Sequence, residues 1–210
     1  MCIMVYAHWL YGNACMKGEE CVPSSWDIFF ENFGWMLCWW NAAGVPLVYC
    51  AQAVYLYSHP PVHMHPNLFM AIIIALSVSY YVFDTANSQK NRFKMMMSGT
   101  YVPRFTFPQL PWGTLNNPTY LSTKAGSALL VDGWYAFCRK PHYLADWVMA
   151  TCWGLACGVD SPLPYLYSAF FAVMIMHRTL RDEHRCSQKY GDDWTAYKRR
   201  VPYVYFPGII

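Results

Sequence analysis

The distribution of charged residues constrains this chain more than any other feature of its sequence. Between Glu31 and Asp84 there is no Asp, Glu, Lys or Arg, and between Asp146 and Arg178 only Asp160 carries a charge. Charged residues make up 13% of the 210 residues, whereas soluble domains contain roughly 25%. A soluble domain of this length cannot bury such long uncharged runs. The sequence therefore predicts an integral membrane protein.

The uncharged runs predict an all-α fold with four spanning or nearly spanning helices. The first lies within residues 28–57 and is expected to kink or break near Pro46, because proline removes a backbone donor and clashes with the preceding turn. The second covers residues 68–83. The apolar residues 2–11 are fewer than the roughly 20 helical residues that cross a bilayer. We interpret them as the end of a span that begins before this sequence, which is then a truncated chain.

The last two predicted spans, residues 143–159 and 163–176, form a hairpin with its tip at residues 160–164. A polar stretch, residues 84–141, precedes the hairpin and contains residues 107–113, which are expected to form an ordered loop. Basic residues gather before and after the hairpin. Because a hairpin returns the chain to its starting side, both basic groups share one face, and the positive-inside rule makes that face cytosolic.

Several kinds of site are disfavoured by the sequence. The nine cysteines are scattered and form no C-x-x-C pair, so neither a disulfide framework nor a metal site is predicted. No G-x-G-x-x-G motif follows a strand, which argues against a Rossmann dinucleotide site. Any dinucleotide must therefore be bound by helices and their ends.

Two pairs of polar residues favour binding of a phosphorylated cofactor. Lys90 and Lys94 lie one helical turn apart on one face, and two cations there suit a terminal phosphate such as the 2′-phosphate of NADPH. Arg178 and Asp182 have the same spacing, so they can pair with each other or grip a polar ligand together. The alternative for any one of these basic residues is contact with anionic lipid head groups.

Two long stretches of the chain carry recognisable motifs. The first, residues 129–146, contains Leu-Leu-Val-Asp-Gly-Trp-Tyr and Arg-Lys-Pro-His-Tyr, and the second covers residues 163–203. Both resemble the signatures of the sterol reductase family, which includes the C-14, C-7 and C-24(28) reductases and the lamin B receptor. Residues 181–186 are as similar to the C-7 subfamily as to the C-24(28) subfamily, but other segments resemble the fungal-type C-24(28) subfamily. Those segments are residues 13–21, 41–46, 84–91, 106–113 and 139–143.

The resemblance implies a fold, an activity and a site. It implies the C-terminal half of a bundle of about ten transmembrane helices, with residues 1–83 contributing to a sterol pocket and residues 84–210 binding NADPH. The implied reaction is reduction of the C-24(28) double bond of a sterol in ergosterol-type biosynthesis. The implied location is the endoplasmic reticulum membrane, with the lipid bilayer and the sterol as partners and no nucleic acid or obligate protein partner. The implied cofactor-binding residues are Lys90, Lys94, Leu129, Trp134, Arg178, Asp182 and Tyr197.

Reduction of an isolated alkene also requires a proton donor. Asp27 and Glu31 lie four residues apart at the start of a predicted span, where desolvation can keep a carboxylic acid protonated, and His142 and Tyr143 compete for this role. Reduction of the C-7 or C-14 bond is the nearest alternative. A methyltransferase that uses S-adenosylmethionine is another, because Arg-Lys-Pro-His-Tyr resembles the Arg-His-Pro-x-Tyr helix start of that class. A purely structural membrane protein is the third.

Overall fold

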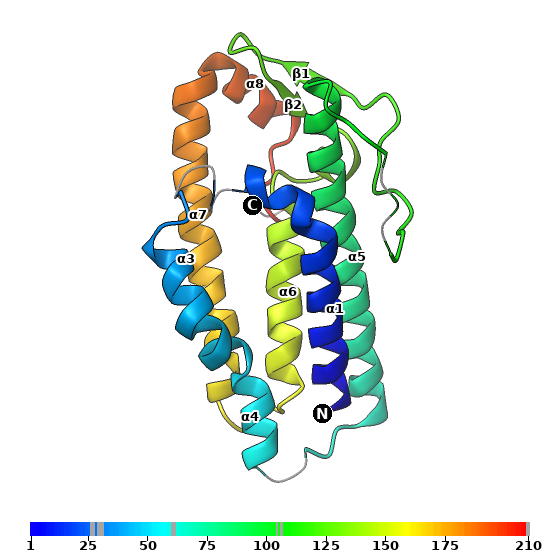
Figure 1. The fold of residues 1–210 in the computed structure, drawn as a ribbon, viewed down its shortest axis with the longest axis vertical. Helices are drawn as coiled ribbons and strands as arrows, with labels where there is room; N and C mark the ends of the chain where they lie inside the picture. The colour runs from blue at the N-terminus through cyan, green and yellow to red at the C-terminus, as the bar shows by residue number, and fades with distance from the viewer. Residues whose placement is uncertain (26–27, 29–31, 60–61, 104, 106, 209–210) are drawn as a thin grey trace. The chain divides into compact units, whose positions relative to one another are not determined.

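The computed structural model describes residues 1–25, 28, 32–59, 62–103, 105 and 107–208, and these are mostly helical (Figure 1). They form two compact units. The first contains Met1–Val78 and Val148–Phe171, and the second contains Ser79–Trp147 and Ala172–Ile210. Three helices contribute residues to both units: α5 (Pro66–Met97), α6 (Pro141–Leu155) and α7 (Leu166–Tyr190).

In the first unit, the predicted break near Pro46 is confirmed. Helix α1 (Cys2–Gly18) and the 3-10 helix η1 (Glu19–Ser24) come first. The apolar run around Pro46 then forms three pieces, which are α3 (Trp35–Trp39), the π-helix η2 (Trp40–Tyr49) and α4 (Ala51–Ser58). Pro46 lies inside η2, where the wider π-turn accommodates a residue that an α-helix excludes. The short 3-10 helix η4 (Leu163–Tyr165) leads into α7.

Aromatic side chains form much of the core of the first unit. The rings of Tyr49 and Trp153 lie 5.2 Å apart between centroids, and Tyr167 lies 4.8 Å from Tyr49 and 5.6 Å from Trp153. The fully buried Gln52 donates from Nε2 to the carbonyl of Pro164 at 3.0 Å. This bond offsets the desolvation of the amide nitrogen.

The second unit contains strand as well as helix. Strands β1 (Tyr120–Ser122) and β2 (Ala128–Leu130) pair antiparallel with Tyr120 opposite Leu130, and they are followed by η3 (Gly133–Ala136). Leu130 packs in one buried cluster and the adjacent Val131 in another, since successive residues of extended chain point to opposite sides. This small hairpin is the departure from the predicted all-α fold.

Helix α8 (Asp192–Arg200) lies beside the hairpin in Figure 1. The backbone N–H of Lys124, in the hairpin turn, donates to the Asp193 carboxylate at 2.7 Å.

Helix α5 extends well past the predicted span of residues 68–83, into the polar stretch that begins at residue 84. The helix continues to Met97, because residues 84–97 contain no Pro or Gly and their polar side chains bond to the helix backbone. The Thr85 hydroxyl donates to the Tyr81 carbonyl at 2.6 Å, and the Asn87 amide donates to the Phe83 carbonyl at 2.9 Å. The end of the apolar run therefore marks the end of the apolar surface, while the helix itself goes on.

By length and composition, α5 is the one helix in the described part of the chain that is able to cross a membrane. Helix α6 has 15 residues, which reach about 22 Å at 1.5 Å per residue, less than the roughly 30 Å of the hydrocarbon core. The apolar part of α7 ends before Arg178. The other three predicted spans are thus shorter or more interrupted than expected.

Candidate functional site

All seven residues that the resemblance assigns to a cofactor belong to the second unit. Lys90 and Lys94 lie on α5, one turn apart as predicted, and the Lys90 ammonium lies 5.9 Å from the centroid of the Tyr135 ring. This is the distance of a cation–π contact. The remaining five are distributed over four elements, with Leu129 in β2, Trp134 in η3, Arg178 and Asp182 on α7, and Tyr197 on α8.

Trp134 is fixed by polar contacts with α5. Its backbone N–H donates to Gln89 Oε1 at 3.0 Å, and its indole Nε1 donates to the Thr85 hydroxyl at 2.8 Å. Gln89 is buried, and its Nε2 also donates to the Trp112 carbonyl at 2.7 Å. We use the name Gln89 brace for Gln89 and its two bonds, one to the Trp134 N–H and one to the Trp112 carbonyl. It connects the loop before β1 and η3 to the same helix that carries Lys90 and Lys94.

The turn before Trp134 has two special residues. Asp132 caps η3, accepting hydrogen bonds from the backbone N–H of Thr119 at 2.9 Å and of Gly133 at 2.7 Å. These two bonds lower the pKa of the Asp132 carboxyl, because they stabilise its ionised form. Gly133 has a φ of +59°, which is the left-handed region that glycine adopts without steric cost.

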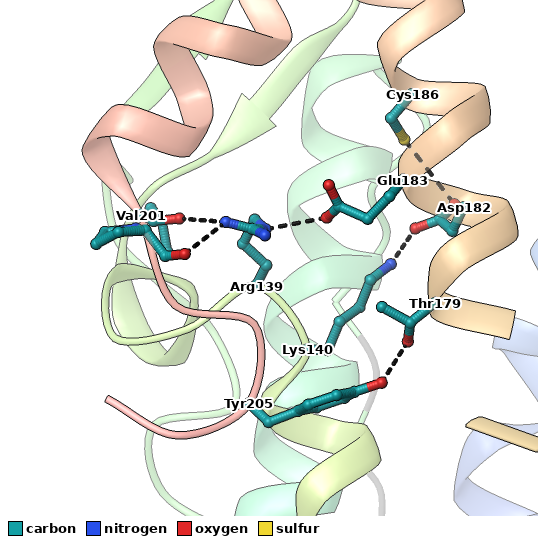
Figure 2. A network of polar contacts seen from close by, with 9 residues as sticks. Arg139, Lys140, Thr179, Asp182, Glu183, Cys186, Val201 and Tyr205 are labelled. Atoms are coloured by element: carbon teal, nitrogen blue, oxygen red, sulfur yellow. Dashed lines mark hydrogen bonds and ion pairs between the residues drawn. The ribbon is translucent and has the colours of Figure 1, made fainter. Parts of the chain in front are cut away.

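A pair of ion pairs lies where α7 passes the start of α6 (Figure 2). The Lys140 ammonium bonds to the Asp182 carboxylate, and Arg139 Nε lies 3.1 Å from Glu183 Oε1. The Lys140 and Arg139 side chains are only 8% and 7% exposed. At such burial a charge is costly unless it is paired.

The pKa values of Lys140 and Asp182 depend on two opposing effects, which are the burial of each group and the attraction between their opposite charges. Burial disfavours the charged form of Lys140, but the Asp182 carboxylate more than offsets it, and the pKa of Lys140 is raised. Burial likewise acts to raise the pKa of Asp182, and the Lys140 ammonium outweighs it, so that pKa is lowered. Both groups are therefore ionised at neutral pH.

His142, one residue before the predicted span 143–159, lies among several basic side chains. It is buried, and its Nδ1 lies 3.3 Å from the Tyr135 hydroxyl. Its pKa is lowered well below the usual value, first by burial and then by repulsion from four cations. In order of effect these are Lys90, Lys140, Arg178 and Lys94. The side chains from α5, α7 and the start of α6 thus act on a common region of the second unit.

Leu129 and Tyr197 lie in a packed cluster. Tyr197 is 5% exposed, stacks on Trp194 at 5.1 Å between ring centroids, and packs with Val131 and Val201, with the half-buried Leu129 against them. Burial raises the pKa of the Tyr197 phenol. In this arrangement both residues contribute to the core that supports β2 and α8.

The structure supplies one site residue that the sequence reasoning missed. The sequence predicts that Asp182 pairs with Arg178 or shares a ligand with it, and the structure shows an ion pair of Asp182 with Lys140. Lys140 stood in the Arg-Lys-Pro-His-Tyr motif, and its position before a helix start was the signal that could have identified it. The two predicted proton donors, Asp27 and Glu31, lie outside the described residues.

The first unit contains a separate, mostly apolar cavity of about 730 Å³. Its lining comes mainly from the start of α1, the end of α4, the segment between α4 and α5, and the start of α5, and includes Ile3, Leu56, Val62 and Phe69. The volume lies within the range of small-molecule sites. Within the residues that the structure describes, no three His, Cys, Asp or Glu side chains are grouped so that they could bind a metal ion.

Comparison with known proteins gives a match over the whole chain. Residues 1–210 match the family described as the ergosterol biosynthesis ERG4/ERG24 family. The Delta(24(24(1)))-sterol reductase of Gibberella zeae is 48% identical over 209 residues, which are 99% of this chain and 35% of that protein. The Delta(24(24(1)))-sterol reductase erg4A of Aspergillus fumigatus is 47% identical over 206 residues, which are 97% of this chain and 44% of that protein.

More distant relatives carry another activity in their names. The Delta(14)-sterol reductase erg24 of Schizosaccharomyces pombe is 37% identical over 210 residues, covering 98% of this chain and 46% of that protein. The chain thus spans between about a third and a half of the length of these curated relatives.

Proposed function

The chain belongs to the ergosterol biosynthesis ERG4/ERG24 family, and from this membership we propose that it forms part of a membrane sterol reductase that uses NADPH. The proposed reaction is reduction of the C-24(28) double bond of a sterol in ergosterol-type biosynthesis. Two relatives named Delta(24(24(1)))-sterol reductases are 48% and 47% identical to this chain, whereas the relative named a Delta(14)-sterol reductase is 37% identical. The higher identity favours the C-24(28) double bond over the C-14 double bond as the one reduced.

The observation that carries the cofactor assignment is the convergence of cations on His142. Four basic side chains act there, and one of them, Lys140, is paired with Asp182. Burial lowers the pKa of Lys90 to about 7, so a phosphate beside it would favour its charged form. Like charges close together repel one another, and the phosphates of a dinucleotide would relieve that repulsion. In this proposal Lys90 and Lys94 contact the 2′-phosphate, Arg178 and Asp182 bind further polar groups of NADPH, and Leu129, Trp134 and Tyr197 pack beside it.

The bound cofactor would supply a hydride, and the protein's own residues perform the rest of the chemistry. Protonation of the alkene at C-28 places the positive charge on the tertiary carbon C-24, which then accepts the hydride. Asp27 or Glu31 is the proposed proton donor, as a carboxylic acid kept neutral by desolvation. The apolar cavity in the first unit suits the hydrocarbon part of a sterol. Apolar walls would also exclude water from the charged carbon.

The wider setting belongs to the same proposal. Residues 1–83 would contribute to the sterol pocket and residues 84–210 would bind NADPH, within a bundle of about ten transmembrane helices. The basic segments would face the cytosol and the bundle would span the endoplasmic reticulum membrane, in agreement with the positive-inside rule.

Two experiments test the proposal. Calorimetric titration of the protein in lipid nanodiscs should show tighter binding of NADPH than of S-adenosylmethionine, and the opposite order would indicate a methyltransferase. Sterol analysis of cells that lack the gene should show accumulation of a 24(28)-methylene sterol. Accumulation of a Δ7 or Δ14 intermediate instead would assign the enzyme to that bond and refute the C-24(28) proposal.

A further inference from the structure

The segment that follows α8, residues 201–205, bonds to two parts of the chain that flank the proposed cofactor site. Arg139 N–H donates to the Tyr203 carbonyl and Lys140 N–H to the Val204 carbonyl, both at 2.9 Å. Val201 is 1% exposed and belongs to the cluster that contains Tyr197. We call residues 201–205 the clasp segment.

The Arg139 guanidinium connects the clasp segment to α7 (Figure 2). Its Nη1 donates to the carbonyls of Val201 at 2.9 Å and Pro202 at 2.8 Å, while its Nε bonds to Glu183. A planar guanidinium offers several donors in a fixed fork, which a lysine ammonium does not reproduce. One buried side chain thereby fixes two successive backbone carbonyls and a carboxylate.

The other end of the clasp segment also bonds to α7. The Tyr205 hydroxyl lies 2.6 Å from Thr179 Oγ1 and 3.4 Å from the Ile175 carbonyl. Thr179 and Glu183 are four residues apart on one face of the helix, and Asp182 lies between them in the chain. The clasp segment therefore bonds to α7 directly at Thr179 and, through Arg139, at Glu183. Its backbone also fixes Lys140, the residue that pairs with Asp182.

We infer that Arg139 is a positioning residue for the cofactor site, acting through the clasp segment and Glu183 to fix Lys140 and Asp182 before the cofactor binds. The inference rests on the proposed function, because it assigns NADPH to the site that contains Asp182. Preorganisation of this kind lowers the ordering cost of binding. Its loss weakens affinity for the cofactor and leaves the chemical step, once the cofactor is bound, little changed.

The test compares four variants in the protein reconstituted in nanodiscs. Arg139→Met should raise the Kd and KM for NADPH at least tenfold, with kcat at saturating NADPH within about twofold of wild type. Arg139→Lys should give an intermediate Kd, because an ammonium restores the pair with Glu183 without the fork to the carbonyls. Arg199, exposed on α8, provides the control variant Arg199→Met, whose Kd should equal that of wild type.

A milder variant covers the case in which Arg139→Met does not fold. Tyr205→Phe removes only the hydroxyl. It should raise the Kd for NADPH about two- to tenfold, which corresponds to the loss of one or two hydrogen bonds. Proteolysis of the variant after Arg200 should also be faster. An unchanged Kd in Tyr205→Phe and in any folded Arg139 variant overturns the inference and leaves the proposed function intact. If the wild-type protein binds no NADPH, the proposed function fails and the inference fails with it.

Discussion

Replacing Gly133 with alanine should destabilise the second unit by about 2–5 kcal/mol, for two physical reasons. The φ of +59° at this position costs a residue with a Cβ about 1–2 kcal/mol. The new Cβ would also lie 2.3 Å from Gln89 Oε1, 2.9 Å from Gln89 Cδ and 3.0 Å from Leu115 Cδ1. Contacts under 3.0 Å force the buried Gln89 amide to move.

Movement of Gln89 breaks the brace that fixes Trp134. The amide would lose its bonds to the Trp134 N–H and the Trp112 carbonyl, each contributing about 0.5–1.5 kcal/mol net. Because Trp134 is a proposed cofactor contact, the affinity for NADPH should fall together with the stability.

Gly126 provides the matched control for this experiment. Its φ is +78°, and a Cβ there would meet no atom within 4 Å, so Gly126→Ala carries the backbone cost alone, about 1–2 kcal/mol. Denaturant unfolding in detergent, followed by tryptophan fluorescence, gives both free energies. Gly133→Ala should be less stable than Gly126→Ala by about 1–3 kcal/mol. Equal stabilities of the two variants would refute the role assigned to the Gln89 brace.

Three further predictions concern the same unit. The lowered pKa of Asp182 and the raised pKa of Lys140 mean that their pair stabilises the fold at neutral pH. That stability should be lost as the pH falls through the folded-state pKa of Asp182 and as it rises through that of Lys140. In thermal unfolding measured over a range of pH, Asp182→Asn should make the melting temperature depend less on pH on the acid side. Asp132→Ala should cost about 1–3 kcal/mol of unfolding free energy by removing two acceptors, and Asp132→Asn less, since one oxygen remains. Trp134→Phe should cost about 1 kcal/mol by removing the indole donor to Thr85, and an unchanged unfolding midpoint would contradict that bond.

Local patterns predicted the elements of this chain better than their ends. The uncharged runs located helices because burial in lipid or in a core excludes unpaired charge. They did not locate the end of α5, because helix formation does not require an apolar surface. The spacing of Lys90 and Lys94 correctly predicted that they lie one turn apart on α5, since helical periodicity is local.

The contacts that build the candidate site are not local, and periodicity carries no information about them. Lys140 and Asp182 are 42 residues apart in the chain, and Gln89 and Trp134 are 45 apart. Helical spacing identifies Arg178 as a possible partner of Asp182. The contact of Asp182 with Lys140 arises from the packing of α7 against the start of α6 within the second unit, which no spacing predicts. The NADPH contacts of the seven predicted residues stay predictions that the titrations above test.

The clasp segment has a consequence for how the protein is made. Arg139 and the carbonyl of Val201 are 62 residues apart, and a ribosome adding about 5–20 residues per second needs roughly 3–12 s to pass from one to the other. During that interval Arg139 has neither of its carbonyl partners, and Lys140 lacks the backbone contact that fixes it. The region around Asp182 is thus completed late, after α7 and α8 have been synthesised, and the proposed binding of NADPH would have to wait for the clasp segment.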